Sequence, residues 1–156
     1  MRTAYFDCFS GISGDMTIGA LIDAGASFEA LQAQLATLNL PGYELALEKV
    51  TKHGIAGTKF HVRVHDAGPL HRRLRDIEAI LRASRLQSSI QEHALAIFTR
   101  LAEAEATIHQ TTVDQVHFHE VGAIDSIVDI TGTVIGLHLL GVQRVLASAV
   151  NSKSEQ

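Results

Sequence analysis

The densest group of side chains that could do chemistry lies between residues 117 and 129, where most other positions are apolar. Two imidazoles and three carboxylates fall there, on His117, His119, Glu120, Asp125 and Asp129. Residues 113–118 predict a strand, so His117 and His119, two positions apart, would share one face. Gly122 would break that strand, and the residues after it predict a helix that carries Asp125 and Asp129 four positions apart.

Two carboxylates at helical spacing among Ile, Val and Leu repel each other, and burying their charge costs several kcal/mol without a compensating cation. A divalent cation held by imidazole and carboxylate would remove that cost. The alternative is a histidine-rich strand edge beside aspartates that only bond locally. Because five ligand-type residues converge on one turn, the segment favours a metal or catalytic site, with His117, His119, Glu120, Asp125 and Asp129 as metal ligands.

A second candidate site lies near the N-terminus, where a predicted buried strand at 3–6 runs into a loop of small residues. Ser10, Gly11, Ser13 and Gly14 precede a helix predicted from residue 15 to 24, and the free N–H groups at such a helix start suit a phosphate or carboxylate. The loop lacks the lysine of a Walker A motif and the spacing of a dinucleotide fingerprint. Asp7 and Asp15 could hold a hard cation such as magnesium; in the alternative, Asp15 only caps a tight turn.

The remaining reactive side chains give weaker evidence for a functional site. Cys8 could be a nucleophile if a histidine lay beside it, but a buried and inert thiol is the simpler interpretation. Most of the nine histidines are individually typical of surface or core positions. His61 and His65 would share a strand face, and with His71 they form the best secondary cluster.

Composition excludes several classes of function. The chain has 156 residues, a net charge of −4 and a pI near 6.1, so nothing predicts a nucleic-acid partner. The basic residues at 71–75 predict the solvated face of an amphipathic helix, with an anion-binding patch as the alternative. No apolar run is long enough to span a membrane, and the first residues do not resemble a signal peptide. A single cysteine cannot form an internal disulfide, which favours the cytoplasm.

The elements that must position these residues alternate between helix and strand, which predicts an α/β fold with an antiparallel hairpin lobe. We expect helices at 28–38, 70–83 and 89–109, hairpin strands at 43–52 and 58–65 with a possible kink at 56–57, and a last strand at 144–149. The helix at 89–109 should open with a capping box from Ser89 to Glu92 and bury Ile90, Ala94, Ile97, Phe98, Leu101 and Ile108. Residues 1–150 would form one domain, and 151–156 a polar tail.

Three long blocks together resemble the LarC family of nickel-insertion proteins. They are Asp7-x-x-Ser10-Gly11-Ile12-Ser13-Gly14-Asp15-Met16, residues 101–106 (LAEAEA) and residues 117–129 (HFHEVGAIDSIVD). The resemblance extends to about residue 149. It implies a nickel chelatase, classed as a lyase, that inserts nickel into a pyridinium bisthiocarboxylate mononucleotide in a CTP-dependent reaction, making the nickel-pincer cofactor of lactate racemase.

The resemblance also implies partners and cofactors. Nickel would be the metal handled, with magnesium or manganese accompanying CTP, and Asp7, Asp15 and Glu120 would take part in catalysis. Family members are richer in histidine between the hairpin and the next helix, and they continue into a further domain linked with nucleotide use. We therefore expect a C-terminal LarC domain or subunit as partner, and a homo-oligomer. A nickel metallochaperone without catalysis and a metal-dependent phosphohydrolase remain as alternatives.

Overall fold

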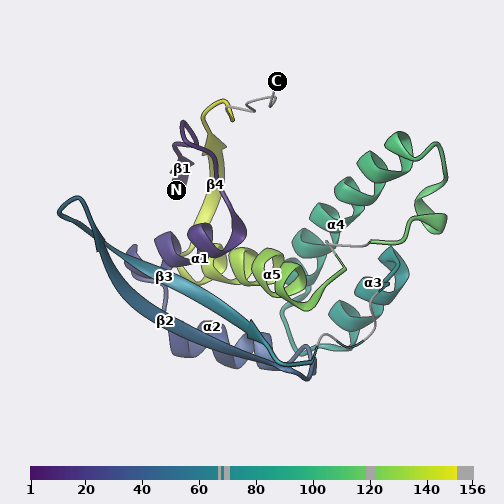
Figure 1. Cartoon of the computed structure of the whole chain (residues 1–156), viewed down its shortest axis with the longest axis horizontal. Helices are drawn as coiled ribbons and strands as arrows, with labels where there is room; N and C mark the ends of the chain where they lie inside the picture. Colours follow the sequence, from purple (N-terminus) through teal and green to yellow (C-terminus); the bar gives the residue numbers. More distant parts are fainter. Residues whose placement is uncertain (67, 69–70, 119–121, 151–156) are drawn as a thin grey trace.

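The structure is a computed structural model that describes residues 1–66, 68, 71–118 and 122–150. It confirms the mixed α/β class (Figure 1). In chain order, the elements are β1 (Arg2–Phe6), α1 (Gly14–Asp23), α2 (Phe28–Ala36), β2 (Tyr43–Lys52), β3 (Ile55–Val64), α3 (Leu74–Ala83), α4 (Ser88–Ile108), a short 3-10 helix (Val113–Gln115), α5 (Ile124–Leu139) and β4 (Val142–Ala147). None of the helices in the described residues combines the length and the apolar run needed to cross a bilayer.

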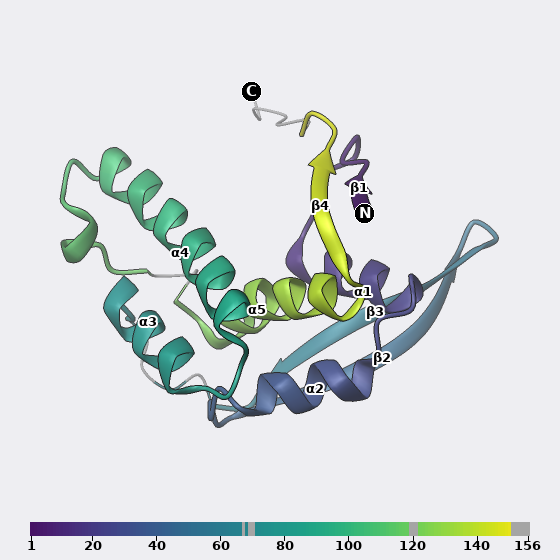
Figure 2. The same cartoon turned by 180° about the vertical axis from the view of Figure 1, so that it is seen from behind.

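Helix α5 is the centre of the core, and α1, α2 and α4 all pack against it (Figure 2). Its side chains Ile127, Val128 and Ile135 are fully buried. The helices approach closely where α5 carries glycine: a Cβ added to Gly132 would lie 2.9 Å from Cδ1 of Ile18 on α1. Apolar residues lie on most sides of α5, so this helix packs against several neighbouring helices at once.

Strands β2 and β3 form an antiparallel hairpin that pairs without interruption from Tyr43 opposite Val64 to Lys52 opposite Ile55. His53 and Gly54 form its two-residue turn with φ of 52° and 80°, as a type I′ hairpin turn requires. The hairpin was predicted, but β3 begins at Ile55 and not at residue 58, and it has no kink at 56–57. The tight turn lets the ladder continue to the last pair.

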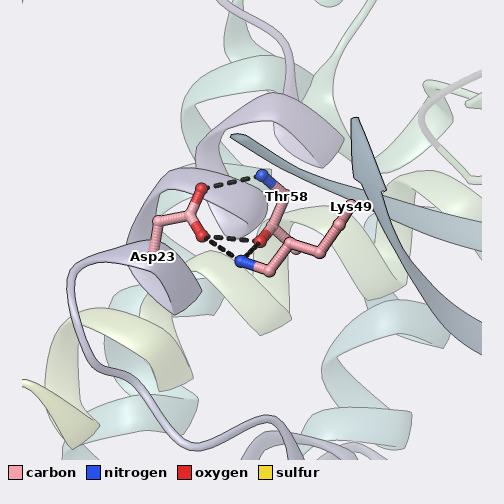
Figure 3. A network of polar contacts seen from close by, with 3 residues as sticks. All are labelled: Asp23, Lys49 and Thr58. Atoms are coloured by element: carbon pink, nitrogen blue, oxygen red, sulfur yellow. Dashed lines mark hydrogen bonds and ion pairs between the residues drawn. The ribbon is translucent and has the colours of Figure 1, made fainter. Parts of the chain in front are cut away.

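A polar network fastens this hairpin to the end of α1 (Figure 3). The Asp23 carboxylate accepts the Thr58 N–H at 2.8 Å, the Thr58 hydroxyl at 2.5 Å and the Lys49 ammonium at 2.8 Å. These bonds, the one from Lys49 first, lower the pKa of Asp23 to about 2. The ionised carboxylate is favoured in the fold, so the stability it contributes is present above pH 4 and is lost as the pH falls toward 2.

Strands β1 and β4 form a separate parallel pair, with Ala4 opposite Val145 and Tyr5 opposite Leu146. The strand predicted at 3–6 is confirmed, but its predicted burial is wrong. Tyr5 is 64% exposed, because no further strand or helix of the described chain covers the outer face of the pair. Strand β4 begins at Val142, directly after α5, and ends at Ala147.

Three other predicted elements differ from the structure. Residues 113–118 form a 3-10 turn and a single bridge between Phe118 and Arg72 instead of a strand. Helix α3 begins at Leu74, which leaves 71–73 outside it. Helix α4 begins at Ser88, so the predicted capping box is wrong; the Gln91 side chain instead donates to the carbonyls of Ser84 and Leu86. The buried stripe of α4 is Ile90, Ala94, Phe98, Ala102 and Ala106, whereas Ile97 and Ile108 are exposed and Leu101 is half-buried.

Candidate functional site

The loop after β1 is folded around Cys8, which is 3% exposed. The Cys8 N–H donates to the Ser148 hydroxyl at 2.7 Å, and the Cys8 carbonyl accepts the Gly11 N–H at 3.0 Å. Gly11 has φ of 89°, a left-handed conformation that suits glycine. This turn buries the thiol, as the simpler interpretation of Cys8 predicted, and leaves Asp7 and Ser10 exposed.

The start of α1 arranges its own polar groups around Asp15. The Ser13 hydroxyl donates to the Asp15 carboxylate at 2.5 Å, and the Met16 N–H donates to the same oxygen at 2.8 Å. Ser13 occupies the N-cap position, but its side chain accepts no bond from the helix. The carboxylate of Asp15 therefore sits at the positive end of α1, which stabilises its charge.

Gly14 brings this loop into contact with α5. A Cβ added to Gly14 would lie 2.5 Å from Cβ of Asp129 and 2.8 Å from its Oδ2. Only a residue without a side chain permits this approach. The contact unites the two segments that the sequence singled out separately, the small-residue loop and the acidic pair of α5.

Three carboxylates meet at this contact. Burial and then the charges of Asp15 and Asp125 raise the pKa of Asp129 to about 7. Its Oδ1 is buried and has no hydrogen-bond partner in the described part of the chain. Asp125 is exposed and accepts the Ser126 N–H at 2.9 Å. An unpartnered carboxylate among like charges favours a bound proton or a nearby cation.

His117 contacts the start of α3. Its exposed ring has Nε2 3.1 Å from the Arg73 guanidinium and stands edge-on to His71, with 6.4 Å between ring centroids. His119 and Glu120 lie outside the described residues. Within the described residues, no three His, Cys, Asp or Glu side chains are grouped as metal ligands. The structure thus joins Asp15, Asp125 and Asp129, and gives His117 neighbours at the start of α3.

The secondary cluster predicted from His61, His65 and His71 does not form. On the hairpin, His61 Nε2 lies 2.9 Å from Glu48 and His65 Nε2 lies 3.3 Å from Glu44, each across the ladder on β2. The ring contact of His71 is with His117. Only His61 lies within β3, which ends at Val64, and each of the two histidines has an acid of β2 as its partner.

Sequence reasoning missed Arg72. The basic residues at 71–75 were predicted on a solvated helix face, yet Arg72 is 6% exposed and precedes the helix. Its guanidinium donates to the Gly122 carbonyl at 2.6 Å, and its own carbonyl accepts the Phe118 N–H at 3.0 Å. Arg72 therefore ties Phe118 and Gly122, which lie on either side of the undescribed residues 119–121, to the start of α3. No local pattern distinguishes it from the exposed Arg75, because its partner is fifty positions away.

A family model described as "Nickel insertion protein" matches residues 4–154 of the chain. Two strains of Desulfitobacterium hafniense, DSM 10664 / DCB-2 and Y51, have a relative named "Pyridinium-3,5-bisthiocarboxylic acid mononucleotide nickel insertion protein". Each is 55% identical over 151 residues, covering 97% of this chain and 37% of the relative. A Geobacter sp. (strain M21) relative is 53% identical over 150 residues, which cover 96% of this chain and 39% of the relative. The chain thus spans less than two-fifths of the length of these relatives. No solved structure matches it.

Proposed function

Because the chain belongs to the nickel insertion protein family, we propose that it takes part in inserting nickel into a pyridinium bisthiocarboxylate mononucleotide. The product would be the nickel-pincer cofactor of lactate racemase. The chain would act in the cytoplasm together with a C-terminal LarC domain or subunit that uses CTP, and as a homo-oligomer. Family membership supports nickel as the metal and the mononucleotide as the substrate class. The geometry of the site supports the roles that we propose for its residues.

The observation that carries this proposal is the contact between Gly14 and Asp129. It places the N-terminal ends of two helices and the carboxylates of Asp15 and Asp125 around one half-buried carboxylate. Such a site binds a divalent cation in exchange for a proton, because the cation relieves the repulsion that raises the pKa of Asp129.

Nickel is the cargo of this site and has to be released again. Carboxylate and imidazole ligands with open positions hold nickel(II) less firmly than a closed thiolate cage, so sulfur donors on a substrate can take it over. We assign Asp125, Asp129, His117, His119 and Glu120 as the nickel ligands. The last two lie outside the described residues, and Arg72 binds Gly122, which follows them in the sequence.

The mononucleotide phosphate would bind at the loop of Ser10, Gly11, Ser13 and Gly14. The Gly11 N–H is already bonded to Cys8, so the helix N–H groups of Gly14 and Asp15 are the better donors. Asp15 would repel a bare phosphate at that point. A cation between the carboxylate and the phosphate would remove this repulsion. We propose that Asp7, Asp15 and Glu120 act through such a cation, which would be the magnesium or manganese that accompanies CTP.

Nickel titration of paired variants tests the assignment. Asp125→Asn with Asp129→Asn, and separately His117→Ala with His119→Ala, should each weaken nickel binding at least tenfold in calorimetry. Asp114→Asn is the matched control, since Asp114 is an exposed acid on the 3-10 helix. Wild-type affinity in the aspartate pair would refute the acidic site, and wild-type affinity in the histidine pair would make those histidines structural.

The alternative functions predict other outcomes. A metallochaperone would bind nickel without transferring it to the mononucleotide, even with CTP and the remainder of a relative present. A phosphohydrolase would cleave simple phosphate esters with magnesium and no nickel. Following mononucleotide, nickel and released phosphate in one reaction separates all three functions.

A further inference from the structure

The β1–β4 pair is unusual as a finished sheet. Parallel strands occur almost only in larger sheets with both faces covered, and two strands alone are marginally stable. Here the neighbouring side chains of Tyr5 and Leu146 are 64% and 41% exposed, and Val145 is 49% exposed. Both faces of the pair are therefore partly uncovered, and the outer edge of β4 has no partner strand among the described residues.

The direction of the β4 backbone identifies which groups are unpaired. The Ser148 N–H donates to the Phe6 carbonyl at 2.9 Å, so it points toward β1. Backbone groups alternate in direction along a strand, which directs those of Leu146 toward β1 as well. The N–H and carbonyl groups of Val145 and Ala147 then point to the opposite edge, on the regular part of the pairing after the register shift between Val142 and Arg144.

An apolar groove of about 520 Å³ lies along that opposite edge. Gln143 and Val145 of β4 form one wall, while Ile97 of α4 and Val134 and Leu137 of α5 form much of the rest. His93 and His138 are the only titratable residues lining it. In Figures 1 and 2, β1 lies on one side of β4 and α4 on the other, so the groove and the free edge face the same way.

We propose that this edge is an interaction surface for an additional β-strand, which pairs with β4 and places apolar side chains in the groove between β4, α4 and α5. The occupant is an extended, apolar segment from the part of the longer family members that this chain does not span. The free backbone groups require a strand, the uncharged groove requires apolar side chains, and the relatives are more than twice as long as the region they share with this chain. The inference rests on family membership and is independent of the metal chemistry.

Co-expression tests this. The 156-residue chain is produced together with the remainder of the Desulfitobacterium hafniense relative outside the 151-residue match. The two should co-purify, and hydrogen exchange at the amides of Val145 and Ala147 should slow in the complex. Val145→Lys should weaken the complex at least tenfold, because a lysine at an edge blocks strand addition. Ile108→Lys, at the far end of α4, is the matched control and should bind normally.

Failure to form a complex would overturn the proposal, as would a complex that tolerates Val145→Lys and leaves both amides exchanging rapidly. Sedimentation of the chain alone tests whether a second copy of the chain binds this edge. A dimer in which the same two amides are protected would make a second copy the occupant, and the proposal would be wrong. Nickel titration of each variant keeps this result separate from the proposed function, since Val145→Lys should bind nickel like wild type.

Discussion

At the scale of single residues, Asp129 combines properties that rarely occur together on one carboxylate. It is half-buried, one of its oxygens has no partner in the described part of the chain, and two further carboxylates act on it. The glycine opposite it, Gly14, leaves space for the carboxylate but for no additional atom. The charge and the size of this pair can be tested separately.

The charge of Asp129 should set the pH dependence of stability. Its pKa is raised from 3.8 to about 7 in the fold, so the folded protein binds the extra proton. The stability from this proton is present below pH 4 and is lost as the pH rises through 7, by roughly 1–3 kcal/mol after allowance for solvent screening. Asp129→Asn should remove this fall in urea unfolding measured from pH 4 to 8, and Asp114→Asn should retain it. A flat wild-type profile would contradict the assigned pKa.

The size of residue 14 should matter as much. Gly14→Ala would place Cβ 2.5 Å from Cβ of Asp129, so α1 and α5 must separate. We expect a loss of about 1–3 kcal/mol in unfolding free energy together with weaker nickel binding. Ser10→Ala, in the same loop but exposed, should change neither. Unaltered stability in Gly14→Ala would show that the two helices do not meet as described.

At the scale of elements, the important arrangement is the attachment of Phe118 and Gly122 to the start of α3. Arg72 makes it through its guanidinium and its backbone carbonyl, and Gly122 fits because a Cβ there would lie 2.9 Å from Cβ of Phe118. Predicted nickel ligands lie next to Phe118 and Gly122 in the sequence, so we expect this attachment to affect nickel binding.

Arg72→Met should release Gly122, and with it Phe118, from the start of α3. It keeps much of the apolar volume but leaves the buried Gly122 carbonyl without its charged donor, which costs about 1.5–3 kcal/mol. Amide exchange at Phe118 and Gly122 should accelerate, and nickel affinity should fall. Arg75→Met is the control, because Arg75 is exposed on the same segment. Equal effects of the two substitutions would mean that Arg72 is not the tether.

At the scale of the whole molecule, the chain covers 37% of its Desulfitobacterium hafniense relatives. The proposed site is acidic, and the one buried guanidinium of the described residues, that of Arg72, is engaged by Gly122. A triphosphate is held by cationic side chains, and the proposed site offers none. We therefore propose that a partner domain uses CTP.

The activity of the chain alone should reflect this. We expect nickel binding but little or no CTP-dependent insertion of nickel into the mononucleotide by the 156-residue chain. Adding the remainder of a relative should raise insertion at least tenfold, as followed by the absorbance of the product. Insertion by the chain alone at the rate of a full-length relative would show that no partner is needed.

Short-range sequence patterns predicted most of the helices and strands. The turn residues His53 and Gly54 mark the hairpin, and Gly25 follows α1 with φ of 110° in the left-handed conformation that ends helices. The three long blocks likewise indicated the family that the comparisons show. These features depend on neighbouring residues, so period and turn chemistry suffice to find them. Strand 113–118 failed because apolar alternation over six residues also suits a 3-10 turn followed by one bridge.

Only the tertiary structure decided which of the predicted residues meet. The sequence marked the loop at 7–15 and the acids of α5 as separate sites; the contact of Gly14 with Asp129 makes them one. It marked His117 and the acids as ligands of one metal, and the structure places the His117 ring beside Arg73 and His71. It placed Arg72 in water, and the fold buries it. Each of these outcomes depends on how distant segments pack, and the burial that raises the pKa of Asp129 does not exist until α1 lies on α5.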